Sequence, residues 1–311
     1  GIVLSPEQFP SLDAHRGHSL VVTDGTTVLG GDDKAGVAAI MELMKFYLDH
    51  PEYPHGTIRC CFTPDEEVGN GPMWLGQSHF ACDYAYTVDG GGLGGLEFEN
   101  FNAADAKIVL HGVSTHPGSA KGTMRNALLV GMELQSLLPA LETPFYTEGY
   151  EGFYHLESMS GSCDRAEMHY IIRDHDRARF EERKKEMEKA VQTIRSRFGE
   201  DAAELELSDS YYNMAEKIRP HRHLVDNAVA AMKELGIEPV IEPIRGGTDG
   251  CRLSFEGIPC PNLGTGAYHF HSRYEYVSID EMQKNVALLA RIIGRYAHYE
   301  LDEEKEQEQT V

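Results

Sequence analysis

Two adjacent carboxylates, Glu66 and Glu67, are the residues of this sequence whose type and spacing most directly suggest chemistry. They follow an apolar run, residues 57–62, that has the character of a buried strand. Neighbouring side chains at the end of a strand can point to different targets, so one carboxylate could bind a metal while the other accepts a proton. The ordinary alternative is a solvated surface pair, and the other acidic and histidine positions of the chain decide between the two.

Three more positions could complete a metal site with this pair: Asp32, Asp89 and His271. Each falls on a loop at a probable strand or helix end, mostly beside glycines, where a rigid scaffold commonly carries function. Carboxylate and imidazole are the ligands that suit zinc, manganese or cobalt. Gathering so many anions without a cation would cost several kcal/mol. The pattern therefore indicates a di-metal hydrolase, in which two cations share a bridging carboxylate and activate one water.

Other catalytic patterns find little support. The run Gly90–Gly95 formally matches a dinucleotide-binding loop, but such a loop must open a helix, and residues 96–101 alternate as a strand does. The sequence contains neither the G-x-S-x-G elbow of serine hydrolases nor the H-E-x-x-H motif of zincins.

The elements around the acidic motifs predict an α/β domain. Residues 33–50 carry apolar side chains on one helical face, with Asp32 or Asp33 at the N-cap position. The runs 57–63 and 84–88 are typical of buried strands. Both acidic motifs would then lie just past the carboxyl ends of strands, where open α/β sheets bind their ligands. The apolar residues of the helix are Val37, Ile40, Met41, Met44, Tyr47 and Leu48.

A chain of 311 residues predicts two domains, and its middle part changes character. Strands expected at 106–110 and 168–172 alternate with helices expected at 126–138 and 180–198, which indicates a small α+β domain inserted into the first. Helices expected at 224–235 and 279–296 return to the α/β pattern. We therefore predict a catalytic domain formed by residues 1–102 and 213–300, an inserted domain at 103–212, and an acidic tail at 301–311.

Composition excludes several kinds of partner and location. A formal net charge of −22 argues against nucleic acid or an anionic membrane surface. No apolar run approaches a membrane span, and the first residues lack the pattern of a signal peptide. The six cysteines form no C-x-x-C motif, so we expect buried thiols in a reducing cytoplasm.

Taken together, the motifs resemble those of the M20 family of zinc peptidases, in order and over residues 3–297. Within that family the stretches 148–156 and 164–174 are most similar to the tripeptide aminopeptidases. The resemblance implies a zinc-peptidase α/β catalytic domain with an inserted lid or dimerisation domain, a cytoplasmic homodimer, and release of the N-terminal residue from tripeptides. Another M20-type amidohydrolase, such as a dipeptidase or an acylamino-acid deacylase, is the alternative. The motifs are Gly-Gly-Asp-Asp-Lys-Ala-Gly at 30–36, Pro-Asp-Glu-Glu-Val-Gly at 64–69, Thr-Val-Asp-Gly-Gly at 87–91, Thr-His-Pro-Gly at 115–118, Arg-Gly-Gly-Thr-Asp-Gly at 245–250, and His271.

The resemblance also implies a role for each candidate residue. Asp32 matches the carboxylate that bridges two zinc ions, and Glu66 the general base that takes a proton from the metal-activated water. Glu67 and His271 match ligands of one zinc, and Asp89 a ligand of the other. His116, in the inserted domain, matches a histidine that steadies the oxyanion, often in the partner subunit. Arg173 and Arg245 match arginines near the substrate carboxylate, with ordinary structural arginines as the alternative.

One departure from the family pattern is serious. The family's first metal motif, H-x-D, is absent, because no histidine of this chain is followed two residues later by aspartate. Since the chain also begins with Gly1, it resembles a fragment without its first portion. We therefore expect at most about one zinc in this chain, in place of two in a complete subunit, and weak catalysis. A metal-poor dimerising remnant is the non-enzyme alternative.

Overall fold

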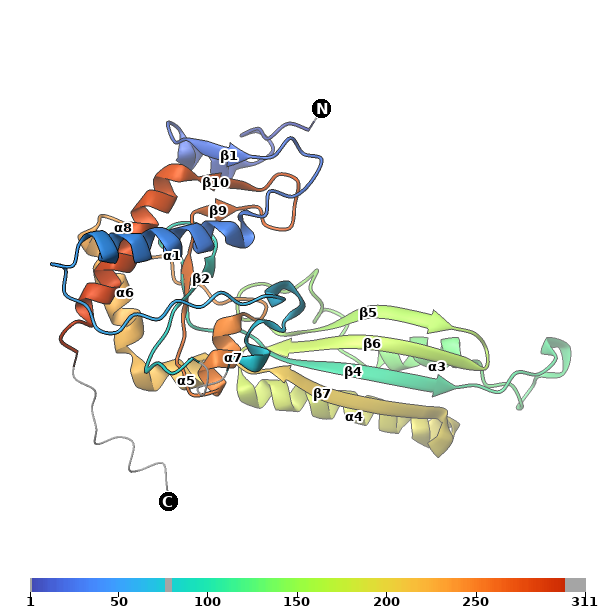
Figure 1. The fold of residues 1–311 in the computed structure, drawn as a ribbon. Coiled ribbons are helices and arrows are strands. Elements are labelled where there is room, and N and C mark those ends of the chain that lie inside the picture. The colour runs from blue at the N-terminus through green and yellow to red at the C-terminus, as the bar shows by residue number, and fades with distance from the viewer. Residues whose placement is uncertain (1, 76–79, 300–311) are drawn as a thin grey trace, which may run out of the picture. The chain divides into compact units, whose positions relative to one another are not determined.

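The computed structural model describes residues 2–75 and 80–299, apart from the side chain of Trp74 (Figure 1). The chain divides into two compact units, each of which is discontinuous in sequence. Unit 1 consists of Gly1–Phe98, Lys217–Glu242 and Leu253–Val311, and unit 2 of Glu99–Glu216 and Pro243–Arg252. The acidic tail expected at 301–311 lies outside the described residues.

In the part of unit 1 that the structure describes, there are two small sheets and three long helices. One sheet has the antiparallel order β1 (Leu20–Val22), β10 (Tyr276–Ser278), β9 (Ala267–Tyr268). In the other, β8 (Asn262–Gly264) pairs parallel with β2 (Thr87–Gly90) and antiparallel with β3 (Leu96–Glu97). The helices are α1 (Gly31–Asp49), α6 (His223–Glu234) and α8 (Ile279–Arg295), and α8 packs against both α1 and α6. Short helical segments are η1 (Pro10–His15), η2 (Glu66–Val68), η3 (Gly71–Trp74) and η6 (Arg219–His221).

Helix α1 buries mainly small side chains near its start, which corrects part of the expected apolar face. Tyr47 of the expected apolar face is buried, as are Ala35, Ala39 and Leu43, whereas Val37 and Leu48 of that face are 41% and 80% exposed. The small face permits close approach to β2, because a Cβ at Gly36 would overlap the Val88 carbonyl oxygen. Close approach of the two backbones therefore favours the face that carries Ala35, Gly36 and Ala39.

Two further expectations in unit 1 need correction. Residues 57–63 form no strand, since none of the strands in the described part of the chain pairs with them. The N-cap of α1 is Gly30, and both Asp32 and Asp33 have non-helical backbone angles within its first turn. Asp33 nevertheless performs the hydrogen bonding of a cap, because its Oδ1 accepts from the Gly36 amide at 3.0 Å.

Unit 2 is a four-stranded antiparallel sheet in the order β5-β6-β4-β7, covered by α3 (Ala127–Ser136) and α4 (Arg177–Phe198). Alternate residues of β4 and β6, such as Ile108 and Met168, are buried in one core with α3 and α4. The two helices therefore cover the same face of the sheet (Figure 1). The strands are β4 (Asn102–His111), β5 (Phe153–Gly161), β6 (Arg165–Asp174) and β7 (Ala203–Tyr211), and the short segments are η4 (Pro117–Ser119) and η5 (Glu200–Ala202). Two short helices, α5 (Ala215–Ile218) and α7 (Asp249–Phe255), lie where the chain passes between the units.

The structure also bears on the expectations for the fold class, the glycine-rich loop, the cysteines and membrane-spanning helices. The mixed α/β class is confirmed, and the segment after Gly95 is the strand β3, as expected for a loop that opens no helix. The six cysteines form no disulfide in the described residues, although only Cys251 and Cys260 are buried and the other four are half-buried. Among the described helices, none combines the length and apolar character that a membrane crossing requires.

Candidate metal centre and active site

Three of the predicted metal ligands converge in unit 1. The Nε2 atom of His271 lies 3.0 Å from Asp32 Oδ2 and 3.0 Å from Glu67 Oε2. One donor atom from each of the three side chains falls within 4.8 Å of the others. Asp32 comes from the start of α1, Glu67 from η2, and His271 from the loop between β9 and β10. Residues far apart in the sequence therefore present three oxygen and nitrogen donors to one point.

A buried carboxylate that the sequence analysis missed holds the first of these segments in place. Glu275 is 2% exposed, and its two oxygens accept from the amides of Gly30 at 2.7 Å and Asp32 at 2.9 Å. Gly30 adopts a left-handed conformation with φ of +67°, which favours glycine at this position. The backbone around Asp32 is therefore fixed from the loop that also carries His271. No local sequence motif predicts this role of Glu275, because the amides that it binds lie more than two hundred residues upstream in the sequence.

Asp33, Asp89 and Glu66 form an acidic group that interacts electrostatically with Asp32. Burial, followed by repulsion from Asp33, Glu66 and Asp32, raises the pKa of Asp89 to about 9. Burial likewise raises the pKa of Asp33 to about 8, and repulsion from Asp32 and Glu66 adds to this effect. Both shifts mean that burial and neighbouring negative charge disfavour the ionised form of these two carboxylates.

The donor set suits a zinc-like ion. Two carboxylates and one imidazole are ligands that zinc accepts, and three protein ligands with one open position are typical of catalytic zinc. Ligand atoms around tetrahedral zinc lie about 3.3 Å apart, close to the 3.0 Å separations found here. A cation at this point would also relieve the repulsion that raises the pKa values of Asp33 and Asp89.

His116, in unit 2, is held in one tautomer. It is exposed at the N-cap of η4, and its Nδ1 accepts a hydrogen bond from the Gly118 amide at 3.1 Å. Since an amide N–H can only donate, Nδ1 carries the lone pair and a neutral ring carries its proton on Nε2. His116 is therefore prepared to donate a hydrogen bond to an oxygen.

The two candidate arginines, also in unit 2, differ in how fully they are engaged. Arg245 donates from Nη1 to the carbonyls of Gly149 and Glu151, and from Nη2 to the carbonyl and hydroxyl of Thr147. Those bonds tie Arg245 to the 147–151 segment and leave chiefly its Nε–H for other partners. Arg173 donates one bond, at 3.4 Å, to the Arg245 carbonyl and lies over the ring of Tyr211. Arg173 therefore has the larger donor capacity.

Comparison with known proteins defines the family. Residues 18–295 match the model of peptidase family M20/M25/M40. The chain belongs to this family. The M20 resemblance inferred from the motifs is thereby confirmed.

Relatives of this M20/M25/M40 peptidase include peptidases T and a solved aminopeptidase structure. The chain is 51% identical over 296 residues to a peptidase T of Caldanaerobacter subterraneus subsp. tengcongensis, covering 95% of this chain and 72% of the relative. It is 54% identical over 293 residues to a peptidase T of Geobacillus kaustophilus, covering 94% of this chain and 71% of the relative. The crystal structure of aminopeptidase PepT from Bacillus cereus has a TM-score of 0.79 at 26% identity, covering 89% of this chain and 74% of that one.

Proposed function

We propose that this chain is a zinc aminopeptidase that releases the N-terminal residue of tripeptides. The observation that carries the proposal is the convergence of Asp32, Glu67 and His271 in an M20/M25/M40 peptidase that is similar to peptidases T.

In this proposal the metal ligands are Asp32, Glu67 and His271, with Asp89 contributing beside Asp32. When bound, zinc would polarise the peptide carbonyl and make water a stronger nucleophile. Three ligands hold one ion firmly, whereas Asp32 and Asp89 alone offer a second ion only two carboxylates. The catalytic site therefore holds about one zinc tightly and a second weakly.

Glu66 is the proposed general base. It shares η2 with the ligand Glu67, and its charge contributes to the raised pKa values of Asp33 and Asp89, so it lies beside the same acidic group. A base in this position accepts a proton from the attacking water and later delivers it to the leaving amine. In this proposal Glu67 binds the metal and its neighbour Glu66 transfers protons.

Residues of unit 2 are proposed to act on the substrate. His116 donates from Nε2 to the oxygen that becomes negatively charged when the peptide carbonyl is attacked, in a role comparable to an oxyanion-hole donor. Arg173 binds the C-terminal carboxylate of the peptide, and Arg245 assists through Nε while it holds the 147–151 segment. Binding of that carboxylate would set the length of the preferred peptide.

A homodimer through unit 2 completes the proposal. The outer face of α3 exposes Leu129 by 61% and Met132 by 63%, and β5, which α3 contacts, is the terminal strand of its sheet. An exposed apolar helix face beside a strand edge is a suitable surface for a second copy. The double substitution Leu129→Glu and Met132→Glu should convert dimers to monomers in light scattering. Leu48→Glu, which alters an 80% exposed leucine of unit 1, is the control and should leave the dimer intact.

The experiment that tests the activity compares substrate classes with zinc present. A tripeptide, a dipeptide and an N-acyl amino acid are offered separately, and initial rates are measured for each. Fastest turnover of the tripeptide supports the proposal. Fastest turnover of the acyl amino acid or the dipeptide would instead favour another M20-type amidohydrolase, and no zinc-dependent turnover would favour a catalytically impaired chain.

A further inference from the structure

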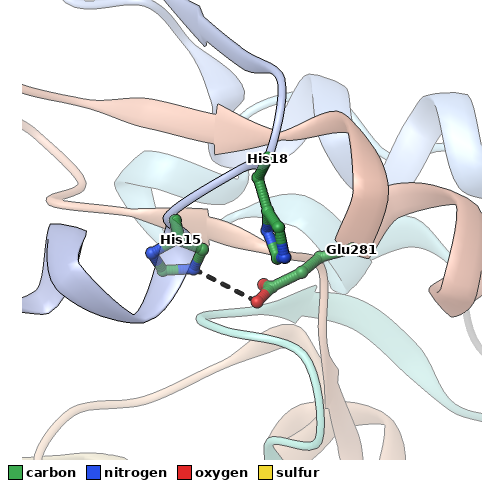
Figure 2. Close-up of side chains that lie close together, drawn as sticks. All are labelled: His15, His18 and Glu281. Carbon is green, nitrogen blue, oxygen red and sulfur yellow. Dashed lines mark hydrogen bonds and ion pairs between the residues drawn. The ribbon is translucent and has the colours of Figure 1, made fainter.

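A second group of potential metal ligands lies in unit 1 and shares no residue with the first. His15, at the end of η1, and His18, just before β1, face Glu281 in the first turn of α8 (Figure 2). One donor atom from each of the three side chains falls within 4.8 Å of the others. His15 is 5% exposed and is 266 positions from Glu281 in the sequence.

The hydrogen bonds of His15 leave a lone pair directed at a carboxylate. Its Nδ1 lies 3.1 Å from the Ser11 carbonyl oxygen, which can only accept, and 3.3 Å from the Tyr276 hydroxyl, which can accept as well. A proton on Nδ1 satisfies both contacts. In a neutral ring Nε2 is then a bare acceptor, and it lies 3.1 Å from Glu281 Oε1. Two acceptors at this distance repel unless a proton or a metal cation is shared between them.

Glu281 does not make the helix-capping hydrogen bond that its position in the sequence predicts. The sequence Ser278-Ile279-Asp280-Glu281 is a capping box, in which the glutamate normally accepts from the backbone N–H of the serine. Here that N–H donates to the Gly266 carbonyl at 2.9 Å instead. Glu281 Oε2 accepts from the Tyr268 hydroxyl at 2.8 Å, and Oε1 is presented to His15.

His18 supplies the third donor. Its Nδ1 lies 2.9 Å from the hydroxyl oxygen of Ser278, a fully buried residue that also accepts from the Glu281 amide. A hydroxyl oxygen has two acceptor positions, so it can accept from His18 Nδ1–H as well. That arrangement leaves the lone pair on Nε2, the nitrogen that faces Glu281 (Figure 2).

We propose that His15, His18 and Glu281 bind a divalent transition-metal ion of the zinc class. The donors are two imidazole nitrogens and one carboxylate oxygen, a set that selects zinc or cobalt over magnesium or calcium. Each donor side chain is oriented by a second contact: Ser11 for His15, Ser278 for His18 and Tyr268 for Glu281. The ion fastens the segment before β1 to the first turn of α8.

The competing explanation is an ion pair without a metal, in which His15 is an imidazolium that donates to Glu281. The two explanations differ in the use of His18. A metal needs His18 Nε2, whereas an ion pair between His15 and Glu281 does not involve it.

The test uses the chain carrying Glu67→Ala and His271→Ala, which removes two ligands of the catalytic site. The chain is loaded with zinc, dialysed, and analysed for metal by mass spectrometry, with cobalt absorption as a second readout. We expect about one ion per chain. Adding His18→Asn, which keeps a donor near Ser278 but removes Nε2, should abolish binding. The same change at the exposed His55 should leave it unaltered.

Glu281→Gln provides an independent variant, because an amide oxygen still accepts from Tyr268 while the anionic ligand is lost. It should weaken cobalt binding at least about tenfold. Zinc should raise the melting temperature of the chain carrying Glu67→Ala and His271→Ala. It should not raise that of the same chain with His18→Asn added. No bound metal in the starting chain would overturn the proposal in favour of the ion pair. Full retention of metal in both the His18→Asn and Glu281→Gln variants would overturn it as well.

Discussion

Substitution of Gly36 by alanine should damage the metal centre without touching any proposed ligand. A Cβ at this position would overlap the carbonyl oxygen of Val88 in β2 and would lie 2.5 Å from Asp33 Oδ1. Real Cβ atoms essentially never approach closer than 3.0 Å, and the nearest neighbour here is backbone, which cannot rotate away. Helix α1 and strand β2 must therefore separate by about 1 Å.

The size of the effect follows from two losses. Overpacking of this kind costs about 1–3 kcal/mol, and the upper end applies because the clash is with backbone. Displacement of Asp33 weakens its bond to the Gly36 amide, a capping interaction worth about 1 kcal/mol. A total near 4 kcal/mol corresponds to a fall in melting temperature of about 8–16 °C for a unit of this size. Because Asp32 and Asp89 belong to the two elements that separate, turnover should fall about a hundredfold.

Thermal unfolding and tripeptide hydrolysis, measured with saturating zinc, check this prediction. Gly294→Ala is the matched control, because Gly294 lies in α8 with open space around it. That substitution should leave activity unchanged and stabilise the chain by up to about 1 kcal/mol. If Gly36→Ala were as stable and as active as Gly294→Ala, the close contact between α1 and β2 could not be what positions the ligands.

Three further predictions concern individual side chains. Glu66→Ala should lose at least about a hundredfold in turnover and keep its zinc, whereas Glu67→Ala should lose zinc; equal metal loss in both would remove Glu66 as the base. His116→Ala should lower kcat by about a hundredfold or more with metal content unchanged, and an unaltered kcat would show that Nε2 does not reach the oxyanion. In chelator-treated protein the free energy of unfolding should fall as pH rises from about 4 to about 9, because Asp89 binds its proton more tightly in the folded state than in the unfolded state. Asp89→Asn should flatten that slope in urea unfolding, and an unchanged slope would mean that Asp89 is not the group responsible.

Local sequence signals predicted the helices of this fold well. The helix expected at 180–198 is α4, Arg177–Phe198, and that expected at 279–296 is α8, Ile279–Arg295. Helical hydrogen bonds connect residues four apart, so periodicity and capping residues suffice to locate them. The strand expected at 57–63 was wrong because strand formation requires a partner from elsewhere in the chain.

Site residues that belong to short sequence motifs could be predicted. Residues that support the site through contacts between distant parts of the chain could not. Asp32, Glu67 and His271 were predicted from their motifs, and the structure brings their donor atoms together. Their supports were not found, since Glu275 reaches residues more than two hundred positions away. The pair of His15 and Glu281 escaped notice for the same reason, because no short spacing links residues 266 positions apart.

The most direct test of the proposed activity is the identity of the products. The chain is incubated with zinc and a tripeptide bearing a free amino terminus, and separately with the N-acetylated form of the same peptide. The account predicts that the free tripeptide yields its N-terminal residue and a dipeptide, that the acetylated peptide is left intact, and that a chelator stops the reaction until zinc is restored. Cleavage of the acetylated peptide, release of the C-terminal residue, or hydrolysis that persists with the chelator would contradict it.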